Sequence, residues 1–319
     1  MTNSMPTLQD IIVARPNVYR YLKPTPLYYY SGLSELIGAS VWVKHENHQP
    51  VGAFKVRGGL NLAAHLTAEE RRAGLFTAST GNHGQSIAFA AQVHGLKATI
   101  AVPEGANRGK VAAMRGLGAE VIHHGSDFDA AREWIMAEAE ARHGRFVGPT
   151  EELLIGGVGT YALEIIETLP DVQSIIVPVG AGSGACGVSL VAKSINPKIE
   201  VIAAQSAQAP AMQLSWQRGQ LVTAEMNTFA EGVATRMPFE NTQRIMRKYL
   251  DDFVLVDDED IKIAIRLLLE HTHNLAEGAG AVSLVAALQL KNRLAGKKVV
   301  LILSGGNLSL EKLQDILGS

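Results

Sequence analysis

The sequence contains one cysteine, Cys186, in 319 residues. A single cysteine can form neither an internal disulfide nor a multi-cysteine metal site, which fits a reducing compartment. The chain also lacks an apolar run long enough to span a membrane, and its N-terminus lacks a cationic start followed by an apolar core. We therefore predict a cytoplasmic protein with no membrane partner.

Aromatic residues and charge of one sign are scarce as well. Aromatic residues make up 6% of the chain, the formal net charge is -2, and no basic block is present. This composition argues against a nucleic-acid surface, which requires clustered Lys and Arg. Hydrophobic residues at 47% and charged residues at 19% are ordinary for a globular protein, so we expect a small-molecule ligand.

Short apolar runs alternate with helical segments along most of the chain. The runs mostly lack strict polar alternation, which is typical of parallel strands covered on both faces. The predicted strands are residues 39–44, 75–78, 98–102, 120–123, 174–178, 200–204, 253–256 and 298–303, and the predicted helices include 8–19, 84–94, 109–117, 127–141, 184–195 and 260–271. The pattern predicts an α/β protein with two doubly wound, mostly parallel sheet domains.

The length suits two such domains, although no Pro-rich or charged linker separates them. Residues 74–147 hold about four strand-helix units of their own, and the chain then returns to the strands of a larger sheet. We therefore expect a small domain, 74–147, inserted into a large discontinuous domain, 1–73 and 148–319. A cleft is expected between them.

The stretch that follows the first predicted strand is HENHQPVGAFKVRGG, residues 45–59. A Pro/Gly turn leads into a helix whose first turn is predicted to carry Lys55. Such a turn lies at the carboxyl edge of a sheet, where ligand crevices form. A lone lysine is usually a solvated surface residue, but two motifs downstream have the same strand-turn-helix placement.

One of them is the glycine-rich loop GAGSGACG, residues 180–187. Free N–H groups at a helix N-terminus favour an anion, although a tight packing turn has the same pattern. Gly182, Gly184 and Gly187 also fit the spacing of a dinucleotide site. A nicotinamide oxidoreductase, however, requires a carboxylate at the end of the next strand, where this chain has Gln205. A compact phosphate monoester is therefore favoured.

The other motif is the loop STGNHG, residues 79–84. Its hydroxyls, amide and N–H groups can bind a carboxylate, or they can simply cap the following helix. His83 has no carboxylate partner suggested by the sequence, so we expect it to position the substrate and not to act as a base. At the end of the last predicted strand, Ser304 can reach a heteroaromatic nitrogen or close a turn.

Four motifs together, AFKVRGG (53–59), STGNHGQ (79–85), PVGAGS (178–183) and SGGN (304–307), resemble the serine/threonine dehydratase and serine racemase family. Their order and spacing match from about residue 24 to the C-terminus. The resemblance implies a pyridoxal-phosphate enzyme of the tryptophan-synthase-β-like fold, fold type II, with pyridoxal 5'-phosphate as cofactor. It also implies a homodimer.

The resemblance further implies the role of each site residue. Lys55 would form the Schiff base with the cofactor and act as the catalytic base, and Phe54 would pack beside the ring. Ser304 would face the pyridine nitrogen, and Asn82 the ring hydroxyl. The phosphate would be bound by Gly180, Ala181, Gly182 and Ser183, and the substrate carboxylate by Ser79, Thr80, Gly81, Asn82 and His83.

The implied reaction is the α,β-elimination of a β-hydroxy-α-amino acid to a 2-oxo acid and ammonia. Serine, threonine, 3-hydroxyaspartate and phenylserine share the reacting atoms, and residues 231–236 are expected to line the side facing the β-substituent. An amino-acid racemase is the alternative. Racemases of this family have a serine as the second acid-base at the position of Thr80. Thr80 keeps the hydroxyl and is therefore the second candidate catalytic residue, but its methyl group crowds the site and restricts its rotamers, which makes racemisation less favoured. From another class, a phosphate-binding module without chemistry would not need Lys55.

Two departures from the family concern metal and regulation. Family members with a divalent-cation site have carboxylates at the positions of Gln205 and Ala211, so we predict that this site binds no Mg²⁺ or Ca²⁺. No other metal motif is present. The chain ends soon after the last family motif, so a C-terminal regulatory domain is not expected.

Overall fold

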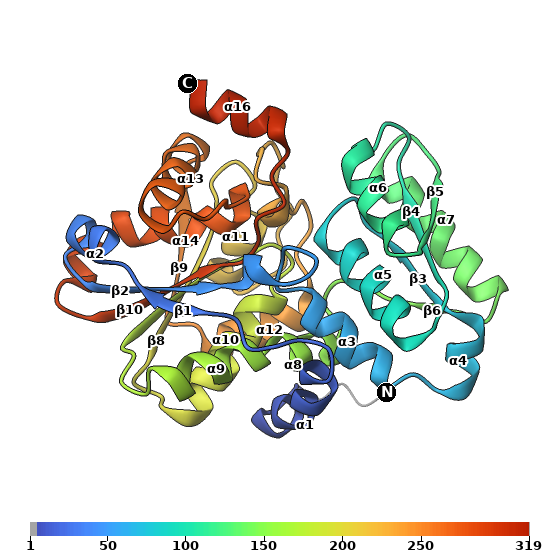
Figure 1. Cartoon of the computed structure of the whole chain (residues 1–319), viewed down its shortest axis with the longest axis horizontal. Coiled ribbons are helices and arrows are strands. Elements are labelled where there is room, and N and C mark those ends of the chain that lie inside the picture. Colours follow the sequence, from blue (N-terminus) through green and yellow to red (C-terminus); the bar gives the residue numbers. More distant parts are fainter. Residues whose placement is uncertain (1–4, 319) are drawn as a thin grey trace.

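The computed structural model describes residues 5–318, so residues 1–4 and 319 of the predicted domain ranges lie outside it. The protein is α/β with two sheets, as the sequence predicts (Figure 1). The larger sheet has six strands in the order β1-β2-β10-β7-β8-β9. Its strands are β1 (Leu27–Tyr29), β2 (Ser40–His45), β7 (Ser174–Pro178), β8 (Glu200–Ser206), β9 (Asp252–Val256) and β10 (Lys298–Leu303).

All neighbouring pairs in this sheet are parallel except β1 with β2. The second sheet has four parallel strands in the order β5-β4-β3-β6. Its strands are β3 (Leu75–Ala78), β4 (Ala98–Val102), β5 (Glu120–His123) and β6 (Arg145–Phe146). Since β3 to β6 are consecutive, this sheet is formed by one stretch of chain inside the other.

Helices cover both sheets (Figure 1). Around the larger sheet lie α1 (Leu8–Tyr19), α2 (Ser31–Ile37), α3 (Val56–Ala64), α8 (Glu152–Val158), α9 (Thr160–Thr168), α10 (Ser183–Ile195), α11 (Ala211–Arg218), α12 (Glu240–Tyr249), α13 (Asp258–Thr272), α14 (Gly278–Gln289), α15 (Lys291–Leu294) and α16 (Leu310–Gly318). With the smaller sheet lie α4 (Ala68–Ala73), α5 (Asn82–His94), α6 (Arg108–Gly116) and α7 (Phe128–Ala141). Short 3₁₀ helices occur at η1 (Glu46–His48) and η2 (Glu231–Val233). Among the described residues, none of the helices has the length and apolarity needed to cross a membrane.

The predicted strands agree closely with those observed. Five of the eight, β3, β4, β5, β7 and β10, have the predicted bounds, and the other three are offset or extended by one or two residues. β8 continues to Ser206 because its pairing with β9 extends to Ser206 opposite Val256. Two short strands, β1 and β6, are not individually predicted, since three and two residues are too few to show a pattern.

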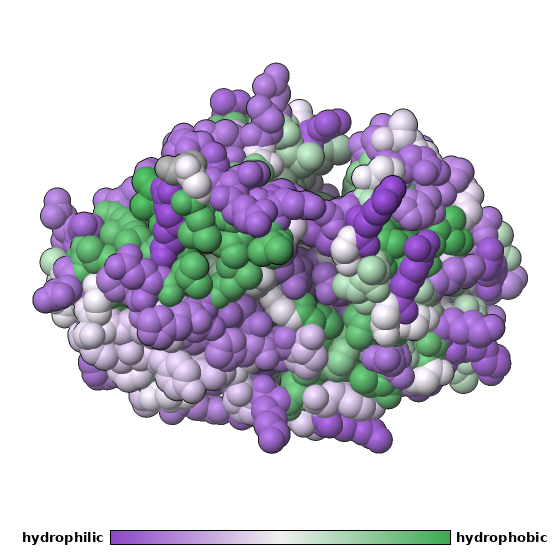
Figure 2. Space-filling view, turned by 45° about the horizontal axis from the view of Figure 1, so that its top comes forward, coloured by the Kyte–Doolittle hydropathy of each residue, from purple (hydrophilic) through white to green (hydrophobic). Residues whose placement is uncertain are grey.

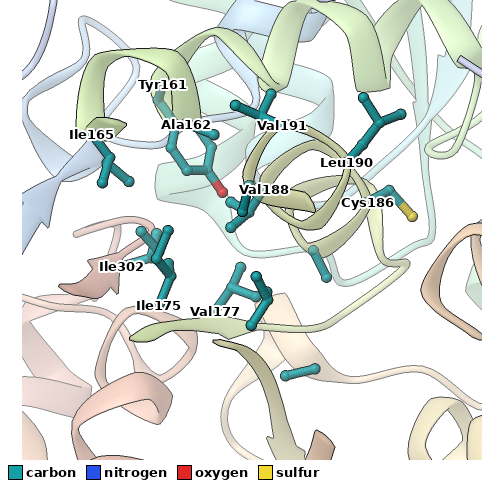
Figure 3. Packing of buried hydrophobic residues seen from close by; sticks show 14 of the residues in the cluster. Tyr161, Ala162, Ile165, Ile175, Val177, Cys186, Val188, Leu190, Val191 and Ile302 are labelled. Carbon is teal, nitrogen blue, oxygen red and sulfur yellow. The ribbon is translucent and has the colours of Figure 1, made fainter. Parts of the chain in front are cut away.

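The core lies on both faces of the larger sheet. Every residue of β7 is buried, which explains its unbroken apolar run. Figure 3 shows how Ile175 and Val177 of β7 face Val188 of α10 and Tyr161 of α9. Each of these four residues is at most 1% exposed. The opposite face packs on α13 and α14 through a second apolar cluster that includes Ile176 and Val282.

A buried ionic network fixes the start of α3. The guanidinium of Arg57 is fully buried and donates to Glu46 (2.8 Å) and to Glu164 (2.6 Å). Lys44 Nζ also donates to Glu164 (2.5 Å), and Thr25 Oγ1 donates to Glu46 (2.6 Å). Two cations therefore neutralise two buried carboxylates, as the cost of burying charge requires. The network joins β2, η1, α3 and α9 directly beside Lys55.

Candidate active site

The chain places Lys55 at the carboxyl edge of the larger sheet. β2 ends at His45, η1 and a turn follow, and α3 begins at Val56. Lys55 is thus the N-cap of α3, one residue before the first turn in which it was predicted. The N–H of the preceding Phe54 donates to Ser304 O (3.1 Å) just beyond β10, which fastens the segment to the centre of the sheet.

The amine of Lys55 lies in a desolvated environment. Burial lowers the pKa of Lys55 to about 8, and the negative charge of Glu277 opposes this shift. Nζ lies 5.0 Å from the ring centroid of Phe54, and within residues 5–318 no hydrogen bond or ion pair of this nitrogen is found. A lysine with a lowered pKa is partly neutral near physiological pH, as a nucleophilic or basic amine requires.

The glycine loop lies between β7 and α10. Gly182 is the N-cap of α10 with φ +101°, a backbone conformation that favours glycine. A Cβ on Gly180 would lie 2.2 Å from Gly232 O, so this residue has no room for a side chain. From behind the loop, Thr242 Oγ1 donates to Ala181 O (2.8 Å). The loop is therefore held with the N-terminus of a 13-residue helix facing the pocket, which favours an anion.

Lys55, the glycine loop and Ser304 line one pocket of about 280 Å³. Its lining residues are Phe54, Lys55, Pro178, Gly180, Ala181, Gly182, Ser183, Gly184, Gly232, Val233, Ala279 and Ser304. The structure thus brings together three of the four motifs that are far apart in sequence. Strand register explains this, because Leu303 pairs with His45, and β10 also pairs with β7.

Residues 79–83 lie outside the lining of this pocket. Ser79 Oγ accepts from the N–H groups of Gly81 (3.2 Å) and Gly84 (2.9 Å), so its lone pairs cap the loop and its proton alone is left for a ligand. His83 Nε2 donates to Val147 O (3.2 Å), and burial, reinforced by the charge of Lys55, lowers the pKa of His83 to about 4. His83 is therefore neutral at physiological pH. Thr80 and Gly81 are partly exposed.

A second hollow of about 360 Å³ adjoins the pocket and shares Gly232 and Ala279 with it. It opens between the two sheets, where Figure 2 shows the surface hollowed between the larger and the smaller part of the molecule. Its rim carries an ion triad: Glu231 accepts from Lys312 (2.7 Å) and forms a salt bridge with Lys110. Burial alone would raise the pKa of Glu231, but these two hydrogen bonds lower it.

A protein-family model described as "Pyridoxal-phosphate dependent enzyme" matches residues 18–305. The chain belongs to this family. Its fold is that of solved members: it superposes with a TM-score of 0.92 on processed threonine deaminase isoform 2 from Solanum lycopersicum (30% identity, 100% of this chain, 96% of that chain) and 0.93 on maize serine racemase (30%, 99%, 98%). An L-threonine ammonia-lyase from Thermotoga maritima is 42% identical over 315 residues, covering 98% of this chain and 78% of its relative.

The pocket fits the cofactor of this family. Pyridoxal phosphate has an aldehyde, a phosphate and a ring nitrogen, and the pocket offers an amine with a lowered pKa, an anion-favouring helix N-terminus and the hydroxyl of Ser304. Gly184 lies on the same wall, and an added Cβ there would make ordinary van der Waals contacts with Tyr161 Oη (3.4 Å) and the ring of Phe54 (3.5 Å).

Sequence reasoning missed Glu277 and Thr242. Glu277 is the N-cap of α14, its N–H donates to Gly305 O (3.1 Å), and its carboxyl accepts from Asn82 Nδ2 (2.6 Å). Burial raises the pKa of Glu277, and the hydrogen bond from Asn82 opposes this shift. A glutamate directly before the small residues GAGA, 278–281, is the only local signal for it.

Gln205 lies at the end of β8, where the metal prediction applies. Its amide is buried; Nε2 donates to Thr235 Oγ1 (2.9 Å), and Oε1 accepts from Gln213 N (3.1 Å). The nitrogen and oxygen of this amide are therefore already bonded to protein groups. Among the described residues, no cluster of three His, Cys, Asp or Glu could hold a metal ion. The absence of Mg²⁺ and Ca²⁺ stays a prediction.

Proposed function

We propose that this chain is a pyridoxal-phosphate dependent ammonia-lyase that converts a β-hydroxy-α-amino acid to a 2-oxo acid and ammonia. The observation that carries the proposal is the convergence of the Lys55 amine, the glycine loop and Ser304 on one pocket. The 42% identity to an L-threonine ammonia-lyase supports this reaction class. Threonine and serine are the substrates that we propose first.

The cofactor would be held by residues of the three motifs. Lys55 would bind it covalently beside Phe54, the loop of Gly180, Ala181, Gly182 and Ser183 would bind its phosphate, and Ser304 would face the ring nitrogen. Asn82 would donate to the ring oxygen. When bound, pyridoxal phosphate supplies an imine carbon and an electron sink, which acidify the substrate α-hydrogen.

Lys55 would then take the α-proton on Nζ. Its pKa of about 8 leaves a useful fraction neutral near neutral pH, which is what a general base requires. His83 would not compete for this proton, because burial and the charge of Lys55 lower the pKa of His83 to about 4 and make it a much weaker base than Lys55. The β-hydroxyl would take up one proton as it leaves, so that the hydroxyl and the proton lost from the α-carbon together account for the water released. The free enamine would then be hydrolysed to the 2-oxo acid and ammonium.

The loop from Ser79 to His83 would bind the substrate carboxylate through hydroxyl and N–H donors. It does not line the pocket, so we propose that residues 74–147 form a small domain that closes onto the large domain, 1–73 and 148–319. The ion triad at the rim, Lys110 with Glu231 and Lys312, joins these two parts. Closure would also exclude water from Lys55.

A racemase remains the second candidate, because the fold superposes on maize serine racemase with a TM-score of 0.93. Thr80 supports elimination over racemisation, since a β-branched hydroxyl has fewer rotamers with which to reach the second ring face. A cytoplasmic homodimer is proposed from composition and family resemblance. Gel filtration with light scattering tests the dimer.

The deciding experiment measures 2-oxo acid and D-amino acid from the same incubation with L-threonine, L-serine, 3-hydroxyaspartate or phenylserine. We expect 2-oxo acid release that is lost in Lys55→Ala. Borohydride reduction followed by peptide mass spectrometry should place the cofactor on Lys55. Abundant D-serine with little pyruvate would favour the racemase, and an unlabelled Lys55 would overturn both.

A further inference from the structure

Besides Ser304, the SGGN motif (304–307) contains Asn307, to which the sequence alone assigns no role. It lies after β10, and its Nδ2 donates twice: to Val51 O (2.8 Å) and to Asn82 Oδ1 (2.7 Å). Val51 belongs to the turn before Lys55, and Asn82 opens α5 beside the smaller sheet. Asn307 therefore joins three segments that are far apart in sequence.

These contacts determine which way both amides face. Val51 O is a backbone carbonyl and can only accept, so Asn307 must point Nδ2 toward it. The second hydrogen of the same Nδ2 is then donated to Oδ1 of Asn82. With Oδ1 of Asn82 engaged in this way, its Nδ2 faces the opposite side, where it donates to Glu277 (2.6 Å).

The backbone around Asn307 restrains its side chain. Gly306 N donates to Gly52 O (2.9 Å), which pairs the two loops directly. An added Cβ on Gly52 would lie 2.6 Å from Asn307 Oδ1, and Gly52 has φ +67°. The Asn307 amide is thus packed against the lysine turn, which limits its freedom to rotate away.

We propose that Asn307 is a positioning residue that sets the orientation of the Asn82 amide for the cofactor. This inference rests on the proposed function, in which Asn82 donates to the cofactor ring oxygen. Of the two Nδ2 hydrogens of Asn82, one binds Glu277 and the other is left for that oxygen. If Asn82 were reversed, its Oδ1 would face both the Glu277 carboxyl and the ring oxygen, and acceptors would meet acceptors.

The test is the variant Asn307→Asp, which keeps the shape and removes the donors. An ionised aspartate can only accept, so Asn82 would turn its Nδ2 toward residue 307. We expect pyridoxal phosphate to dissociate about tenfold more readily from this variant than from wild type at about pH 8. Near pH 5 a fraction of the introduced carboxyl is protonated and can donate again, so the deficit relative to wild type should shrink.

Two further variants complete the design. Asn307→Ala should also weaken cofactor binding, but with a deficit that does not change with pH. Asn47→Asp is the matched control, because Asn47 bonds to Asn274 and not to Asn82. We expect its cofactor affinity to equal that of wild type. Melting of the cofactor-free proteins shows which variants fold. If Asn307→Asp does not fold, a wild-type cofactor affinity in Asn307→Ala would by itself refute the inference.

The outcomes separate the two proposals. A wild-type chain that forms no imine at Lys55 refutes the proposed function itself. If wild type binds the cofactor and both Asn307 variants bind it with the wild-type affinity, only the inference about Asn307 is refuted. A deficit in Asn307→Asp that matches Asn307→Ala at every pH would also refute it, because a packing role alone predicts that result.

Discussion

The hydroxyl of Thr242 donates to the carbonyl of Ala181 over 2.8 Å, from α12 to the centre of the glycine loop. The substitution Thr242→Val keeps the shape of the side chain and removes this hydrogen bond. We expect the loop to hold an anion less firmly, so that the dissociation constant of pyridoxal phosphate rises about fivefold. Equilibrium dialysis or cofactor fluorescence measures this. Thr242→Ser retains the hydroxyl and should bind as wild type does; an equally weak Thr242→Ser variant would contradict the explanation.

The lowered pKa of Lys55 predicts how cofactor capture depends on pH. The pKa of about 8 lies below the ordinary lysine value because burial disfavours the ammonium. The neutral amine, which attacks the aldehyde, therefore becomes the major form above about pH 8. Stopped-flow absorbance of imine formation by cofactor-free protein should show a half-maximal rate near that pH. A midpoint near the ordinary lysine value would show that the amine is hydrated, and Lys55→Arg should give no imine.

The network around Arg57 predicts a large loss of stability on disruption. Arg57→Met leaves Glu46 and Glu164 buried without their main cation, which costs about 3–5 kcal/mol in the free energy of unfolding. Urea unfolding of the cofactor-free protein measures it. The control is Arg15→Ala, since Arg15 and Glu167 form a partly exposed pair (35% and 51%) whose loss should cost less than about 1 kcal/mol. Similar losses in the two variants would contradict the role of burial.

The ion triad at the rim predicts a salt-dependent KM. Glu231→Gln removes the charge that attracts Lys110 of the smaller part and Lys312 of α16. The side chain of Glu231 is 49% exposed, so the KM of the variant for the amino acid should rise only modestly, by up to about fivefold. Added salt should raise the KM of wild type and leave that of the variant almost unchanged. The exposed pair Lys262 with Glu259 provides the control, and Lys262→Gln should retain the wild-type salt response.

The sequence predicts the sheets well because their strands are short apolar runs with clear ends. β7 is buried along its whole length, so no polar residue interrupts its pattern. The placement of Lys55 and Ser304 follows from the same logic, since each comes shortly after a predicted parallel strand. Strand ends that meet at one edge can be inferred from sequence, and the pocket that these residues line is the consequence.

Contacts between side chains from separate segments escape such reasoning. Nothing near Glu277 in sequence indicates that its carboxyl meets Asn82, because that contact depends on how α14 and α5 are placed. Ser79 illustrates the reverse case. Its hydroxyl has the chemistry of a substrate donor, yet its lone pairs are engaged by two N–H groups of its own loop. Residue type alone does not distinguish these uses.

Among the described residues β10 is the last strand in sequence, yet it pairs with β2 on one side and with β7 on the other. During synthesis on the ribosome, β2 and β7 therefore each keep an unpaired edge until residues 298–303 emerge and pair with both strands. A nascent chain lacking them cannot bring Ser304 against the lysine segment. Until β10 has been synthesised, these two strand edges stay unpaired, and the pocket that Lys55 and Ser304 line cannot form.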